Sequence, residues 1–209
     1  MIKVIIADNQ PVVRFGIKSY FKNHSDISTI GESKDFAEVL ETLKNKDVDV
    51  LVLDLEFEGL KSVNVVKTMV KDFPKTKVVI FTNLSETMYA PNLLKTGVAG
   101  FIHKSESLEW LENAIIKASK GEVVFSEAVK RNIAMAAKLH KSERLYRKLS
   151  TRELEVLRYL SAGKKNHEIS EILGLNEKTI STYKLRLLNK LNVTNLVDLV
   201  NKAKTLDIV

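Results

Sequence analysis

The sequence predicts an α/β N-terminal domain built on a doubly wound parallel sheet, followed by a smaller all-α domain. Three observations support this prediction. Short β-branched runs alternate with helical stretches over the first 125 residues, the alternation stops after Gly121, and the pattern from Ser150 onward is helical throughout. A chain of 209 residues is also long enough for two compact units that each bury a core.

The N-terminal part contains five apolar runs, each followed by a segment of helical period. The predicted strands are Lys3–Ala7, Ser28–Gly31, Val48–Leu53, Lys77–Phe81 and Gly100–Ile102. The predicted helices are Val12–Asn23, Asp35–Asn45, Val63–Asp72, a segment ending near Thr96, and Leu108–Lys120. Right-handed crossovers would fold these five units into a flavodoxin-like, five-stranded parallel sheet covered on both faces.

The C-terminal part predicts a helix-turn-helix. Ser150 or Thr151, with Glu153, forms a capping arrangement that opens a helix to Ser161. A short helix, Asn166–Leu173, then ends at Gly174, and a longer helix follows over Lys178–Leu191. A last helix is expected over Leu196–Lys204. The predicted domains are therefore residues 1–125, a linker helix over 126–147, and a helix-turn-helix domain over 148–209.

Composition narrows the classes of protein that fit. Cysteine is absent, no apolar run approaches the roughly 20 residues that cross a bilayer, and Asp8 interrupts the N-terminus where a signal peptide would stay apolar. These features predict a cytoplasmic protein without a membrane partner. The four histidines lack metal-ligand spacing, and a phosphate-cradling glycine loop is absent, which argues against zinc and nucleotide binding.

The net charge of +7 is concentrated in the C-terminal part. Residues 1–125 carry 16 basic and 17 acidic side chains, whereas residues 126–209 carry 17 and 9, which makes them +8. A small basic unit fits a polyanionic partner such as double-stranded DNA, because each phosphate contact releases counterions. Charge alone is equally compatible with a merely solvated basic surface.

Polar side chains close four of the predicted strands. Asp8, Asp54, Thr82 and Lys104 each stand where an apolar run ends. Since the carboxyl ends of parallel strands meet at one edge, two carboxylates, a hydroxyl and an ammonium are expected to converge there. Any one of them could be an ordinary solvated turn residue, but packing does not explain all four.

These residues resemble the site of a NarL/FixJ-type response regulator, and the resemblance covers essentially the whole chain. The stretch KTISTYKLRLLNKL is similar to the branch that contains BvgA and EvgA. The resemblance implies that Asp54 accepts a phosphoryl group from a partner sensor histidine kinase, that Asp8 helps to hold Mg²⁺, and that Lys104 faces the phosphoryl oxygens. It also implies that Thr82 and Phe101 are switch residues and that the protein is a regulator rather than an enzyme.

The chain departs from the family pattern beside this pocket. Asn9 stands where the family has a second acid, so the expected metal ligands are Asp8, Asn9, Asp54 and Glu56, and Mg²⁺ binding should be weakened. Glu56 or Glu58 could restore the missing charge. A receiver that controls DNA binding without phosphorylation is therefore the alternative.

Pro91 is a further departure, within the segment expected to form the fourth helix. An interior proline costs about 3 kcal/mol and removes a backbone donor. The sequence therefore predicts that this helix begins close to Ala90.

The helix after Asn176 has one apolar side, with Ile180, Leu187 and Leu191, and one polar side without an acid after Glu177. By position in the family, Ser181, Thr182 and Leu185 would face base edges. Phosphate contacts are expected from Lys178, Thr179, Lys184 and Arg186, and from Lys164, Lys165 and Asn166 at the preceding helix. A solvated polar face is the alternative explanation.

Helices of this kind usually read two half-sites as a homodimer. The last helix resembles the family's dimerisation helix, with Leu196, Val197, Val200 and Asn201 as the expected contacts, although packing within the domain would also explain its apolar face. RNA polymerase is a further candidate partner. The rival from a different class is a signalling adaptor that does not bind DNA. A hydrolase is a remote alternative, because the sequence lacks a set of nucleophile, base and orienting group.

Overall fold

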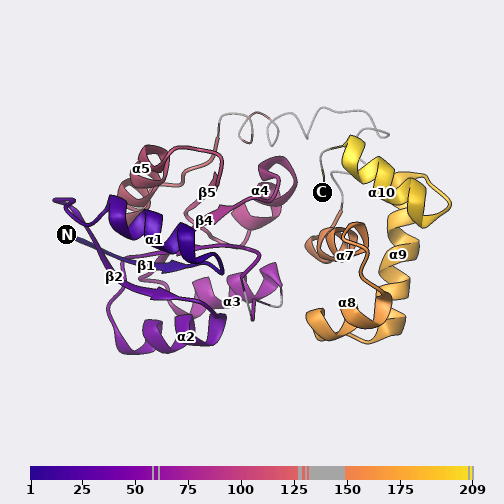
Figure 1. Ribbon diagram of the computed structural model, residues 1–209, viewed down its shortest axis with the longest axis horizontal. Helices are drawn as coiled ribbons and strands as arrows, with labels where there is room; N and C mark the ends of the chain where they lie inside the picture. Colours follow the sequence, from indigo (N-terminus) through magenta and orange to yellow (C-terminus); the bar gives the residue numbers. More distant parts are fainter. Residues whose placement is uncertain are drawn as a thin grey trace.

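The N-terminal domain of the computed structural model is a five-stranded parallel sheet with the strand order β2-β1-β3-β4-β5 (Figure 1). The structure describes residues 1–57, 59–60, 62–126, 129, 131, 149–206 and 208. The strands are β1 Ile2–Ala7, β2 Ile27–Ser33, β3 Val50–Leu53, β4 Lys77–Thr82 and β5 Gly100–His103. All four pairings are parallel, which confirms the predicted doubly wound topology.

Five helices cover the two faces of this sheet. They are α1 Pro11–Tyr20, α2 Phe36–Asn45, α3 Val63–Asp72, α4 Glu86–Leu94 and α5 Leu108–Ser119. Alternate strand residues point to opposite faces. On β1, Val4 and Ile6 pack in the core with α1 and α5, whereas Ile5 and Ala7 pack in the core with α2, α3 and α4.

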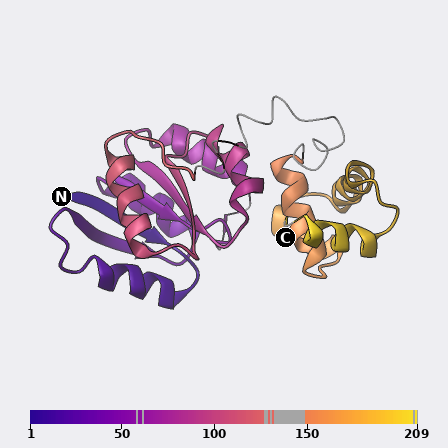
Figure 2. The ribbon, with the colours of Figure 1, turned by 90° about the horizontal axis from the view of Figure 1, so that it is seen from above.

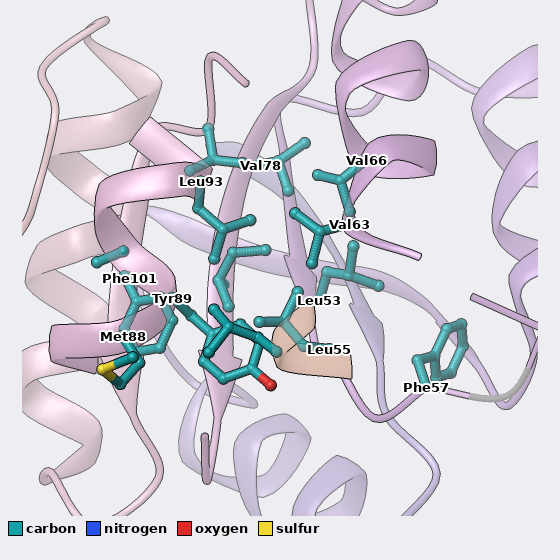
Figure 3. Close-up of a cluster of buried hydrophobic side chains, with 14 of the residues drawn as sticks. Leu53, Leu55, Phe57, Val63, Val66, Val78, Met88, Tyr89, Leu93 and Phe101 are labelled. Carbon is teal, nitrogen blue, oxygen red and sulfur yellow. The ribbon is translucent and has the colours of Figure 1, made fainter. Parts of the chain in front are cut away.

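The prediction that α4 begins near Ala90 is wrong, because the helix runs from Glu86 to Leu94 with Pro91 inside it. Met88, Tyr89 and Leu93 are buried in the sheet core, and Figure 3 shows them grouped near Phe101. Their burial outweighs the local cost of the proline, which is an example of tertiary packing overriding a local preference.

The C-terminal domain consists of α7 Thr151–Ser161, α8 Asn166–Leu173, α9 Glu177–Leu191 and α10 Leu196–Thr205. Ser150 caps α7 in a reciprocal capping box with Glu153. Gly174 ends α8 in the left-handed conformation at φ 62°, where glycine carries no steric penalty. The predicted linker helix over 126–147 lies almost entirely outside the described residues.

Leu154, Leu157, Ile169, Ile180, Leu187 and Leu199 form the buried core of this small domain. In both views α7 lies toward the sheet domain and α9 lies on the side away from it (Figures 1 and 2). Within the described residues, no helix is both long and apolar enough to cross a membrane.

Candidate functional site

A buried ammonium joins two carboxylates at the carboxyl edge of the sheet. Lys104 Nζ lies 2.7 Å from Asp8 Oδ2 and 2.8 Å from Asp54 Oδ2. The three side chains are between 3 and 7% exposed. The sheet produces this cluster because β1, β3 and β5 all end at the same edge, as the sequence predicted for Asp8, Asp54 and Lys104.

Backbone amides hold the other oxygen of each carboxylate. Asp8 Oδ1 accepts a hydrogen bond of 2.7 Å from the Gln10 amide, and Asp54 Oδ1 accepts one of 3.1 Å from the Glu56 amide. Burial raises the pKa of Asp8 in spite of its bond to Lys104. Burial acts to lower the pKa of Lys104, but the bonds to Asp54 and Asp8 outweigh it and raise that pKa. The ammonium is therefore firmly charged.

Thr82 and Phe101 belong to the neighbouring strands β4 and β5. Thr82 is fully buried, and its carbonyl accepts a hydrogen bond of 2.9 Å from the Lys104 amide, which ties the end of β4 to the lysine. Phe101 is 1% exposed and packs in the core with Leu93 and Tyr89 (Figure 3). Thr82 is thus bonded to the backbone of the pocket lysine, and Phe101 packs with residues of α4.

Asn9 and Glu56 meet at the rim of the pocket. The Asn9 side-chain amide donates a hydrogen bond of 2.6 Å to the Glu56 carbonyl oxygen. The Glu56 carboxylate lies 3.5 Å from Arg158 Nη1 on α7. Glu58, the other acid expected to compensate for Asn9, lies outside the described residues.

The polar side of α9 is open to solvent. Lys178, Thr182, Leu185, Arg186 and Asn189 are exposed, and Thr179, Ser181 and Lys184 are partly exposed. The opposite side, with Ile180, Leu187 and Leu191, is buried against the domain core, as predicted. The Arg186 guanidinium lies 5.8 Å from the centre of the Tyr183 ring, and this cation–π contact helps to hold the Arg186 side chain on the polar side of α9.

The start of α8 lies beside the same surface. Lys164 and Lys165 are exposed, and the side-chain Nδ2 of Asn166 donates a hydrogen bond of 3.1 Å to Ser181 Oγ on α9. Lys164 Nζ also lies 3.4 Å from a carboxylate oxygen of Glu168 on α8, which neutralises part of its charge.

The last helix, α10, has both a packing side and an open side. Leu199 and Ala203 are fully buried, and Leu196 packs partly against the same core. Val197 is 68% exposed, Asn201 is exposed, and Val200 is partly exposed. The apolar face of α10 therefore holds the domain together while Val197 and Asn201 remain open to another molecule.

Comparison with known proteins identifies both domains. Residues 4–116 match the response regulator receiver domain, and residues 147–203 match the bacterial regulatory proteins of the luxR family. The chain belongs to the NarL/FixJ family of response regulators. It is a DNA-binding regulator of the two-component type.

Two relatives are similar over nearly their whole length. The transcription regulator BvgA of Bordetella pertussis is 32% identical, with 97% of this chain and 96% of BvgA covered. The response regulator VraR of Staphylococcus aureus is 32% identical, with 92% and 91% covered.

Solved structures of RcsB from Salmonella typhimurium are 28% identical to this response regulator. One covers 98% of this chain and 97% of RcsB with a TM-score of 0.80. Another, bound to a promoter in the presence of a phosphomimetic, covers 98% of both chains with a TM-score of 0.78.

The two domains of this response regulator meet through α7. Glu155 Oε1 accepts a hydrogen bond of 2.9 Å from the Val63 amide, one of the unpaired donors at the start of α3. Arg152 lies 3.0 Å from the other Glu155 oxygen, and Arg158 reaches Glu56. Glu155 is 5% exposed, and its burial raises its pKa. The loop that follows Asp54 is therefore in direct contact with the DNA-binding domain.

Replacement of Glu155 by Ala is expected to lower the free energy of unfolding by about 1–3 kcal/mol, because it leaves the buried Val63 amide without an acceptor. Urea denaturation of the full chain measures this change. Glu155→Gln keeps an acceptor oxygen and should lose less. The exposed Glu171 provides the surface control, and equal stability of Glu155→Ala and Glu171→Ala would contradict the assigned contact.

Sequence reasoning missed Glu155 and Arg158 as linking residues. Both lie on α7, for which sequence reasoning identified the capping residues and the end but no partner outside the small domain. Their spacing of three residues places them on one side of the helix, which is a weak signal for a shared contact. The identity of that contact depends on the receiver surface opposite, which no local pattern encodes.

Proposed function

We propose that this response regulator takes a phosphoryl group on Asp54 and that this modification controls how tightly two copies bind a two-fold site in double-stranded DNA. The observation that carries the proposal is the ammonium of Lys104 between the carboxylates of Asp8 and Asp54, in the same chain as an open basic helix. The proposed donor is a sensor histidine kinase.

The phosphoryl step assigns one role to each pocket residue. An Asp54 oxygen attacks phosphorus, the bond from phosphorus to the donor's leaving atom breaks, and that atom keeps the electron pair. Lys104 balances charge on the phosphoryl oxygens, and the Thr82 hydroxyl and the Phe101 ring respond to the new group.

The oxygen ligands at the pocket fit a hard divalent cation such as Mg²⁺, which receiver domains generally use. Asp8 and Asp54 would supply carboxylates, and the Glu56 carbonyl and the Asn9 side chain would supply neutral oxygens. When bound, such a cation would help to neutralise the charge of the phosphoryl oxygens. Because Asn9 is neutral and donates to the Glu56 carbonyl, the affinity for Mg²⁺ should be lower than in a site with a third carboxylate.

The DNA-binding role rests on α9 and the start of α8. Ser181, Thr182 and Leu185 face base edges, while Lys178, Thr179, Lys184 and Arg186 hold phosphates together with Lys164, Lys165 and Asn166. RcsB, a structural neighbour, has been solved on promoter DNA, which supports this assignment for the response regulator.

Dimerisation brings two such surfaces onto one site. Leu196, Val197, Val200 and Asn201 of α10 are the proposed self-complementary contact, with RNA polymerase as a further partner on the promoter. The proposed division is a receiver domain over 1–125, a linker helix over 126–147 and a DNA-binding domain over 148–209. The proposed location is the cytoplasm.

The test of the DNA-binding role is the salt dependence of duplex affinity. Lys184→Gln and Arg186→Gln should each weaken binding to all sequences similarly and reduce the slope of log K against log salt by about one unit. The assay uses the full chain with and without prior treatment with Mg²⁺ and an acyl phosphate, which should tighten binding. Lys117→Gln, on the exposed side of α5, is the charge-matched control. Unchanged slopes in both α9 variants would favour the signalling adaptor.

A further inference from the structure

Leu185 is the exposed large apolar side chain of α9. It is 63% exposed, in the middle of a surface that otherwise carries cations, hydroxyls and an amide. It follows Thr182 by three positions and Ser181 by four, so the three side chains share one side of the helix. Packing does not explain Leu185, because the core side of α9 is formed by Ile180, Leu187 and Leu191.

The hydroxyls of Ser181 and Thr182, beside Leu185, both donate hydrogen bonds to carbonyls of α9 itself. Ser181 Oγ donates to the Glu177 carbonyl at 3.2 Å, and Thr182 Oγ1 donates to the Lys178 carbonyl at 3.0 Å. Ser181 Oγ also accepts from Asn166 at 3.1 Å. A hydroxyl has a single hydrogen to donate. The centre of this surface therefore offers a DNA base few hydrogen-bond donors.

The apolar groups that remain are the Leu185 side chain and the Thr182 methyl. In the major groove, thymine is the base that presents an apolar group, its 5-methyl. A guanine or cytosine edge placed against Leu185 would lose water without gaining a partner, which is unfavourable. The apolar centre of this surface therefore suits the methyl group of thymine, and the surrounding cations suit the phosphates on either side of the groove.

We propose that Leu185, assisted by the Thr182 methyl, selects thymine by contact with its 5-methyl group at one defined position in each half-site. This inference rests on the proposed DNA-binding function and specifies what the site reads. Ser181 acts beside it as a hydrogen-bond acceptor. Burial of one methyl group strengthens binding by about fourfold, so a two-fold site gains that factor twice.

The experiment removes the methyl group from the DNA. Duplexes that bind the full chain are selected from a random library, and each thymine of the half-site is replaced in turn by deoxyuridine, which pairs as thymine does. The wild type is expected to lose about fourfold in affinity at one position per half-site. In Leu185→Ala the loss at that position should fall well below fourfold, because only the Thr182 methyl remains to contact the base. The variant should fold normally, because Leu185 is exposed.

Lys184→Gln is the matched control, because loss of a phosphate contact should weaken binding while the methyl effect persists. Tolerance of deoxyuridine at every position by the wild type would overturn the inference, and so would a methyl effect of undiminished size in Leu185→Ala. In both outcomes DNA binding itself would stand. Failure to recover any bound duplex would instead overturn the proposed function and the inference with it.

Discussion

Replacement of Asp54 by Asn is expected to abolish phosphoryl incorporation by the full chain treated with Mg²⁺ and an acyl phosphate. The physical reason is that a neutral amide cannot act as the nucleophile that an ionised carboxylate provides. Intact mass measures the outcome, since wild type should gain one phosphoryl group and the variant none. The gain in duplex affinity after treatment should disappear together with the mass gain.

Asp49→Asn provides the control for this experiment. Asp49 lies before β3, at the opposite end of that strand from Asp54, and accepts a hydrogen bond from the Lys3 amide. Its variant should still gain the phosphoryl group. A mass gain that persists in Asp54→Asn would mean that another residue is the acceptor. Wild type that gains no mass and still binds DNA would indicate a receiver that works without phosphorylation.

Replacement of Lys104 by Met is expected to lower the free energy of unfolding by about 3–5 kcal/mol at pH 7, because it leaves two buried carboxylates without their shared ammonium. Urea denaturation of the full chain measures this loss. The double variant Lys104→Met with Asp8→Asn should recover much of the stability, because one of the two carboxylates is gone.

The pH dependence of Lys104→Met provides a second check. Burial already raises the pKa of Asp8, and loss of the bond to Lys104 should raise that pKa further. A carboxyl whose pKa is higher in the folded state stabilises below its unfolded pKa and loses that contribution as pH rises through the folded pKa. The loss in free energy of unfolding of Lys104→Met relative to wild type should therefore become smaller as the pH is lowered. Lys117→Met, on the exposed side of α5, should show neither effect, and a similar loss in both variants would contradict the buried ion cluster.

The elements that the sequence predicted best are those with local signals at their ends. The bounds of α3 and α8 agree to the residue with the prediction. Gly174 marks the end of α8 in the sequence, and Ser62 caps the start of α3 in the structure. Strand ends were less accurate, as in β2, which extends to Ser33. Strand length depends on pairing with a neighbour, which few local residues encode.

The convergence of Asp8, Asp54 and Lys104 was also predictable, because the topology of a parallel sheet brings the carboxyl ends of its strands together. The start of α4 was not predictable. Pro91 favours a later start, but burial of Met88 and Tyr89 extends the helix back to Glu86. Nor could the sequence show that the Ser181 and Thr182 hydroxyls donate to their own helix, because that choice depends on side-chain geometry.

By itself the sequence determined the two folds, the polar residues at the sheet edge and the polar face of α9, because periodicity and helix caps act over a few neighbouring residues. Only the tertiary structure decided that Glu56 faces Arg158 and that Glu155 meets the start of α3. Those contacts join residues about a hundred positions apart. Their free energy depends on burial and orientation, which are set when the two domains pack against each other.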